Sequence, residues 1–176
     1  MRRIILLLVL AFGVGIICTN VFLYLHNPSI GKETSPVGQY SSAEDIPISQ
    51  KGFEKVDINV DKEGLYLTSG CRQLYFNILE SQAYSIATGI GKTIEERPMT
   101  HDLMKDVMDS YGIRLLTARI DSYEKDVFRA KLIMIRDNKV IEIDSRPSDA
   151  AALAVREEVP LYVSSEIMDS KATVVC

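Results

Sequence analysis

The sequence predicts an α+β protein: a single domain with one mixed β-sheet flanked by helices, preceded by one transmembrane helix and a flexible linker. Three observations predict this organisation. Residues 4–25 form a long apolar run without a charge, and residues 27–52 are rich in Pro, Gly and Ser. Residues 53–176 alternate segments of period two with segments of helical period. We therefore divide the chain into an anchor at 1–26, a linker at 27–52 and a domain at 53–176.

The apolar run is long enough to cross a bilayer, since about 22 residues at roughly 1.5 Å each span roughly 33 Å. Arg2 and Arg3 precede it, and Lys32 is the first basic residue after it. This bias predicts a single-pass membrane protein with its N-terminus in the cytoplasm and an extracytoplasmic domain, in contact with the lipid bilayer through residues 4–25. A cleaved signal peptide fits less well, because no small-x-small cleavage site follows the apolar core.

The linker composition of residues 27–52 has neither a strand nor a helix period, which is typical of a flexible tether. In the domain, alternation and turn residues predict strands at 53–60, 65–67, 74–78, 113–122, 127–136, 140–144 and 160–163. Helical periodicity predicts helices at 81–90, 101–111 and 147–156 and a last helical turn at 165–169. We expect Thr100 to be an N-cap and Pro147 to open its helix.

Composition excludes several classes of function. The formal net charge is -4, from 20 Lys+Arg against 24 Asp+Glu, which argues against a broad basic surface for nucleic acid. With two histidines, His26 and His101, a His-cluster metal site is excluded, and the three cysteines contain no CxxC pair. Cys71 and Cys176 both lie in the domain, and the sequence leaves open whether they form a disulfide or stay free thiols.

Two segments carry the candidate chemistry. The stretches 97–103 and 144–150 each combine Arg-Pro, a hydroxyl residue and an Asp ahead of a helix. Each places an Arg near a helix N-terminus, where free N–H groups and the dipole favour an anion. Two such ends facing one cleft could hold a phosphodiester despite the net charge. A purely structural interpretation is also open, in which the hydroxyls cap helices, the Asp residues stabilise first turns and the arginines form surface ion pairs.

His101 is the single histidine of the domain and lies at a helix start, where the dipole favours a neutral base. A divalent cation such as Mg²⁺ or Mn²⁺ would need carboxylates, with Asp102, Asp144 and Asp149 as candidates. A triad of Ser148, His101 and Asp102 is weakly supported, because adjacent helical residues point about 100° apart.

The two segments, RPMTHDL and IDSRPSDAAALA, resemble the bifunctional nuclease (BFN) domain family, whose pattern is R-P-x-T-H-D-L followed by D-A-R-P-S-D-A-I-A-L-A. The later stretch VPLYV fits that family's ending, so the resemblance covers about 53–170. It implies a compact α+β domain that commonly forms homo-oligomers and a nuclease acting on RNA and DNA. Carried over onto this chain, it implies catalytic roles for His101, Asp102, Asp144 and Asp149 and substrate-binding roles for Arg97, Arg146 and Ser148. Thr100, at the same helix start as His101, is a further substrate-binding candidate.

One stretch departs from the family pattern L-P-I-x-I-G-x-x-E-A. This chain has Tyr75, Leu79 and Gln82 in place of the family's Pro, Gly and Glu. If that Glu is a ligand or a base, the chain has lost it. The alternative to a nuclease is therefore a non-catalytic, oligomeric module, tethered to the membrane, that binds an anion or a phosphorylated ligand.

Overall fold

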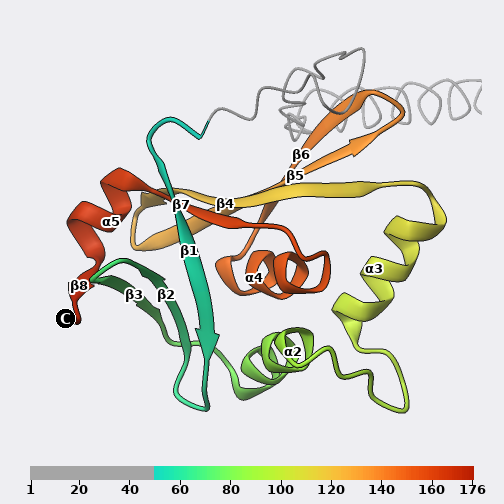
Figure 1. The fold of residues 1–176 in the computed structure, drawn as a ribbon, viewed down its shortest axis with the longest axis horizontal. Coiled ribbons are helices and arrows are strands. Elements are labelled where there is room, and N and C mark those ends of the chain that lie inside the picture. The colour runs from blue at the N-terminus through green and yellow to red at the C-terminus, as the bar shows by residue number, and fades with distance from the viewer. Residues whose placement is uncertain (1–49) are drawn as a thin grey trace, which may run out of the picture. The chain divides into compact units, whose positions relative to one another are not determined.

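The computed structural model describes residues 50–176, which form one α+β domain around an eight-stranded mixed sheet (Figure 1). The strand order is β6-β5-β4-β7-β1-β2-β3-β8, and β4 pairs with β7 in parallel while the other neighbours are antiparallel. The strands are β1 Phe53–Val60, β2 Leu65–Ser69, β3 Arg72–Phe76, β4 Arg114–Glu124, β5 Val127–Arg136, β6 Lys139–Ser145, β7 Leu161–Ser164 and β8 Thr173–Val174. The helices are α2 Glu80–Ile90, α3 Thr100–Ser110, α4 Pro147–Arg156 and α5 Ser165–Lys171.

Helix α4 lies at the centre of the domain, between α2 and the sheet (Figure 1). Its middle is made of alanines and one leucine, all buried: Ala150, Ala151, Ala152, Leu153 and Ala154. Because these side chains are mostly small, neighbouring elements can pack closely around α4. Gly89 of α2 extends this close packing, because a Cβ there would lie 2.6 Å from Val155 and 2.8 Å from the Arg156 guanidinium. Helices α2 and α4 can therefore approach closely.

The predicted elements agree with the structure to within a few residues, and the mixed α+β sheet is confirmed. The prediction that Thr100 is an N-cap is wrong. Helix α3 begins at Thr100 itself, and the N-cap is Met99, whose N–H is bound by the Asp102 side chain at 2.9 Å. Ser148 is likewise not a cap, because the N-cap of α4 is Arg146 and Ser148 is buried.

The C-terminal end is fixed in two ways that the sequence left open or did not predict. Strand β8 adds to the edge of β3, and Cys71 and Cys176 form a disulfide. Within residues 50–176, no helix has the length and apolar character needed to cross a membrane. The predicted span at 4–25 and nearly all of the predicted linker lie outside the described residues.

Candidate functional site

The first turns of three helices line one cleft of about 580 Å³. Because each helix start presents free N–H groups and the positive end of the dipole, the cleft is suited to an anion. The sequence pointed to the starts of α3 and α4 as parts of an anion site, but not to the start of α2, which carries no Arg-Pro pair. The lining residues at these helix starts are Leu79, Ser81 and Gln82 for α2, Met99, Thr100 and His101 for α3, and Arg146 and Asp149 for α4, with Ser145 from the end of β6. We call this space the histidine cleft.

His101 lies between two polar side chains of other helices. Its Nδ1 is 2.9 Å from the Ser85 hydroxyl of α2, and its Nε2 is 3.5 Å from a carboxylate oxygen of Asp149 on α4. Burial lowers the pKa of His101 below its ordinary 6.5, and nearby Arg156 lowers it further, while Asp149 and Asp102 oppose this shift. This shift favours the neutral imidazole near pH 7, and its main cause is burial rather than the helix dipole considered from the sequence.

Asp102 does not line the histidine cleft. One carboxylate oxygen accepts from the Met99 N–H at 2.9 Å, and the other accepts from Arg156 Nε at 2.6 Å. Burial alone would raise the pKa of Asp102, but the hydrogen bonds from Arg156 and Met99 outweigh it and lower the pKa below 3.8. The triad considered from the sequence therefore does not form, since Asp102 serves α3 and Ser148 bonds to Gln82 at 3.0 Å.

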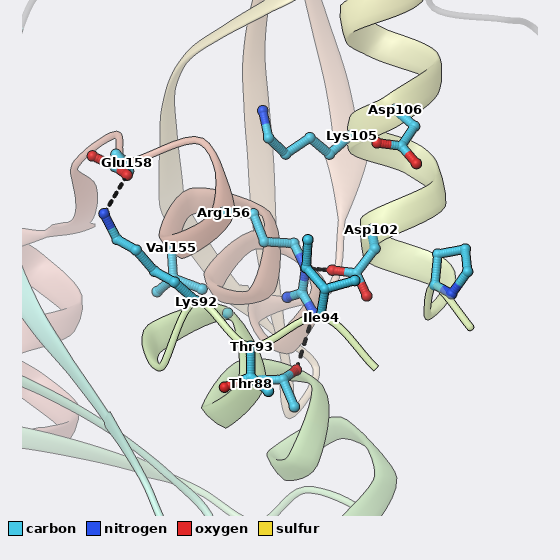
Figure 2. Close-up of a pocket in the computed structure, with 12 residues that line it drawn as sticks. Thr88, Lys92, Thr93, Ile94, Asp102, Lys105, Asp106, Val155, Arg156 and Glu158 are labelled. Carbon is cyan, nitrogen blue, oxygen red and sulfur yellow. Dashed lines mark hydrogen bonds and ion pairs between the residues drawn. The ribbon is translucent and has the colours of Figure 1, made fainter. Parts of the chain in front are cut away.

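Arg156 is a buried residue that no sequence motif singled out. Its side chain is only 4% exposed, and it binds Asp102 of α3, the carbonyls of Ser85 and Ala152, and the Thr88 hydroxyl. Figure 2 shows this guanidinium against Asp102 and Thr88, beside a second pocket of about 260 Å³. Arg156 therefore ties α2, α3 and α4 together behind the histidine cleft. A sequence signal existed, since Arg156 follows Asp149 by two helical turns and so lies on the same face.

The remaining candidates divide into two groups. Thr100, His101, Asp144, Arg146 and Asp149 all line the histidine cleft, so the structure brings five of the eight predicted residues together. Arg97, in the loop before α3, is exposed and lies outside the cleft lining. Half-buried Asp102 and buried Ser148 are also outside that lining. The Arg-Pro segment before α4 therefore contributes its arginine to the cleft, whereas the one before α3 does not.

Gln82 occupies the position of the family's Glu and holds two groups in place. Its Oε1 accepts from the Leu79 N–H at 3.0 Å, and its Nε2 donates to the Ser148 hydroxyl at 3.0 Å. A neutral amide is not a base, so its contribution is to fix the starts of α2 and α4 against each other. Tyr75 lies elsewhere, with its hydroxyl donating to the Glu63 carbonyl at 2.6 Å.

The predicted divalent cation would need several oxygen ligands close together. In the part of the chain that the structure describes, no three His, Cys, Asp or Glu side chains are grouped so as to hold a metal ion. Asp144 and Asp149 share the cleft, but Asp144 faces Arg129 at 3.9 Å and Asp149 faces His101. These residues do not form a site that fits Mg²⁺ or Mn²⁺.

A family model for the bifunctional nuclease domain matches residues 49–175, and the chain belongs to this family. Two uncharacterised proteins of Mycobacterium tuberculosis, from strains CDC 1551 and H37Rv, are each 36% identical over 100 residues, which cover 57% of this chain and 59% of theirs. Bifunctional nuclease 2 of Oryza sativa subsp. japonica is 28% identical over 89 residues, covering 49% of this chain and 27% of its own. The alignment thus spans less than two thirds of each relative.

Proposed function

We propose that this domain is a nuclease that hydrolyses phosphodiester bonds in RNA, DNA or both, with the histidine cleft as its active site. One observation carries the proposal: a neutral imidazole, an arginine and three helix N-termini meet in a single cleft. The relationship to a rice protein named bifunctional nuclease 2 supports the same activity.

The cleft residues have distinct parts in this proposal. Phosphate oxygens accept from the helix N–H groups and from Arg146, whose guanidinium suits bidentate binding. His101 accepts and returns the proton during cleavage, a contribution of roughly 10²–10⁴-fold in general acid–base catalysis. Asp149 orients the imidazole and stabilises it once it is protonated. Asp144 faces Arg129 at 3.9 Å and lines the same cleft as Arg146, so it helps to hold the Arg129 side chain beside the phosphate.

The test is cleavage of single-stranded RNA and DNA by the purified full chain. We expect His101→Ala to reduce the rate by roughly 10²–10⁴-fold. His26→Ala, which changes the chain's other histidine, is the matched control and should cleave at the rate of the unaltered chain. Equal activity in the His101→Ala chain would attribute the cleavage to a contaminating nuclease. Assays with EDTA and with added Mg²⁺ or Mn²⁺ decide separately whether a divalent cation takes part.

The competing function is a binding module, and the neutral Gln82 in place of Glu favours it. Such a module holds a phosphorylated ligand at the same helix N-termini without turnover. Inorganic phosphate would then raise the melting temperature of the full chain by linkage, while neither RNA nor DNA is cut.

Membrane attachment is a further part of the proposal. The charge-free apolar segment 4–25 supports an anchor, and the Cys71–Cys176 disulfide supports an oxidising, extracytoplasmic compartment for the domain. Protease added to spheroplasts should digest the domain, and its protection would contradict this orientation.

Self-association is proposed on the surface of α3. Leu103 and Val107 of α3 and its C-cap residue Tyr111 are exposed and four residues apart, so they lie along one side of the helix. Chemical crosslinking of the full chain in membranes should yield oligomers of defined mass. A monomer at every crosslinker concentration would remove homo-oligomerisation from the proposal.

A further inference from the structure

We propose that Ser85 is the nucleophile of the cleavage reaction, activated by His101 and oriented through Asp149. The proposal rests on the proposed nuclease function and adds a covalent intermediate to it. None of the family motifs in the sequence includes Ser85, and the site emerges only when α2, α3 and α4 are packed together.

The three side chains form a connected series across three helices. Asp149 of α4 is 3.5 Å from Nε2 of His101, and the Ser85 hydroxyl of α2 is 2.9 Å from Nδ1. With the Nε2–H directed at the Asp149 carboxylate, Nδ1 presents its lone pair to the Ser85 hydroxyl, which must then donate. This is the relation of a nucleophile, a general base and an orienting carboxylate.

Ser85 is held in place by its own backbone. Its carbonyl accepts from the Thr88 hydroxyl at 2.9 Å and from Arg156 Nη1 at 2.9 Å. The residue is only 4% exposed, yet it lines the histidine cleft. The hydroxyl is thus fixed against the imidazole at the floor of the space that would receive the phosphate, an arrangement that limits the cost of reaching an attack geometry.

The reaction is balanced in two displacements. In the first, the Ser85 oxygen attacks phosphorus while its proton passes to His101 Nδ1. The bond from phosphorus to the leaving sugar oxygen breaks, and His101 gives that oxygen the proton. In the second, His101 takes a proton from water, the resulting hydroxide attacks phosphorus, and the bond to Ser85 breaks. The serine oxygen regains the proton, and a phosphate monoester is released.

A positioning role for Ser85 is the alternative that the experiment must separate. In that case the hydroxyl only orients His101, and water attacks the phosphodiester directly. The route through Ser85 has two displacements at phosphorus, whereas direct attack by water has one. A serine that only orients His101 would not add a displacement.

The decisive measurement is the stereochemistry at phosphorus. The full chain cleaves a phosphorothioate diester of one configuration in ¹⁸O-labelled water, and the configuration of the product is determined. Two displacements give retention, which we expect. Inversion would overturn the role of Ser85 while leaving the nuclease function intact, whereas absence of any cleavage would overturn both.

Covalent labelling gives an independent readout. A fluorophosphonate probe should label the full chain at Ser85, and peptide mass spectrometry should locate the adduct there. Labelling should be lost in Ser85→Ala and strongly reduced in His101→Ala, while Ser110→Ala, an exposed helical serine on α3, keeps it. Cleavage by Ser85→Ala within a few-fold of the unaltered chain, or labelling elsewhere only, would contradict the proposal.

Discussion

The starts of α3 and α4 carry similar residues and have different roles. Both place an Asp at the third helical position, Asp102 in α3 and Asp149 in α4. Asp102 turns inward to its own N-cap and to buried Arg156, whereas Asp149 faces His101 in the cleft. The difference arises from where each helix begins relative to its Arg-Pro pair. Arg146 is the N-cap of α4, but Arg97 precedes α3 by three residues. An aspartate at the same helical position can therefore stabilise the fold in one helix and line a site in another.

The largest effect should be a loss of stability when Asp102, the structural aspartate of the two, is removed. Asp102→Ala leaves the Arg156 guanidinium buried without its carboxylate, and removing one member of a buried pair costs about 3–5 kcal/mol. Denaturant unfolding of the full chain would measure the loss of stability. Asp106→Ala, an exposed aspartate one turn along the same helix, is the control and should stay within about 0.5 kcal/mol. Similar values for the two variants would contradict the structural role of Asp102.

Changing Asp149, the aspartate that faces the cleft, should instead reduce activity and leave stability nearly unchanged. Asp149→Asn keeps the shape of the side chain but removes the charge that faces His101. We expect nuclease activity to fall by about 10²-fold, at the lower end of general acid–base contributions. Stability should change little, because the Asp149 side chain is 38% exposed. A large loss in denaturation midpoint with normal activity would reverse the assignment of the two aspartates.

The two arginines sharpen the comparison further. Arg146 lines the cleft, so Arg146→Ala should remove a charged hydrogen bond to phosphate worth about 1.5–3 kcal/mol. This corresponds to a KM higher by roughly 10–100-fold. Arg97→Ala should change KM by less than about threefold, since its side chain lies outside the cleft. Steady-state kinetics on a short oligonucleotide distinguishes these outcomes, and equal effects would mean that the loop before α3 closes onto the substrate.

A pH titration tests the link between the two helix starts. Proton NMR should give His101 a pKa below 6.5, because burial and Arg156 disfavour the charged imidazole. Asp149→Asn should lower that pKa further, since Asp149 favours the charged form. The unfolded chain then binds the proton more readily, so the contribution of His101 to stability is present above pH 6.5 and is lost as the pH falls through the folded pKa. A pKa above 6.5 in the folded chain would show that the carboxylates, rather than burial, determine the pKa of His101.

The smallest effect is expected at Thr100. Because Met99 is the N-cap of α3 and Asp102 binds its N–H, Thr100→Ala should cost less than about 0.5 kcal/mol. A true N-cap would cost about 1 kcal/mol. Thermal unfolding separates the two values, and a loss near the larger one would restore Thr100 as a cap.

Much of the fold followed from local patterns. Alternation located β1 and β5, and Pro147 located the start of α4. The site was only partly predictable, since local patterns do not report which side chains meet across helices. Ser85 and Arg156 lie in ordinary helical segments, and their importance depends on the packing of α2 against α4. Strand β8 also escaped prediction, because two residues at a sheet edge carry no periodicity of their own.

The Cys71–Cys176 bond has a consequence for how the domain tolerates damage. The bond joins residues 105 apart in sequence. Every residue of the histidine cleft lies between these two cysteines, within one covalent ring. A single proteolytic cut in any loop of that ring would leave the two fragments attached to each other. Such a nicked chain should migrate at full mass on a non-reducing gel and separate into two bands only after a thiol is added.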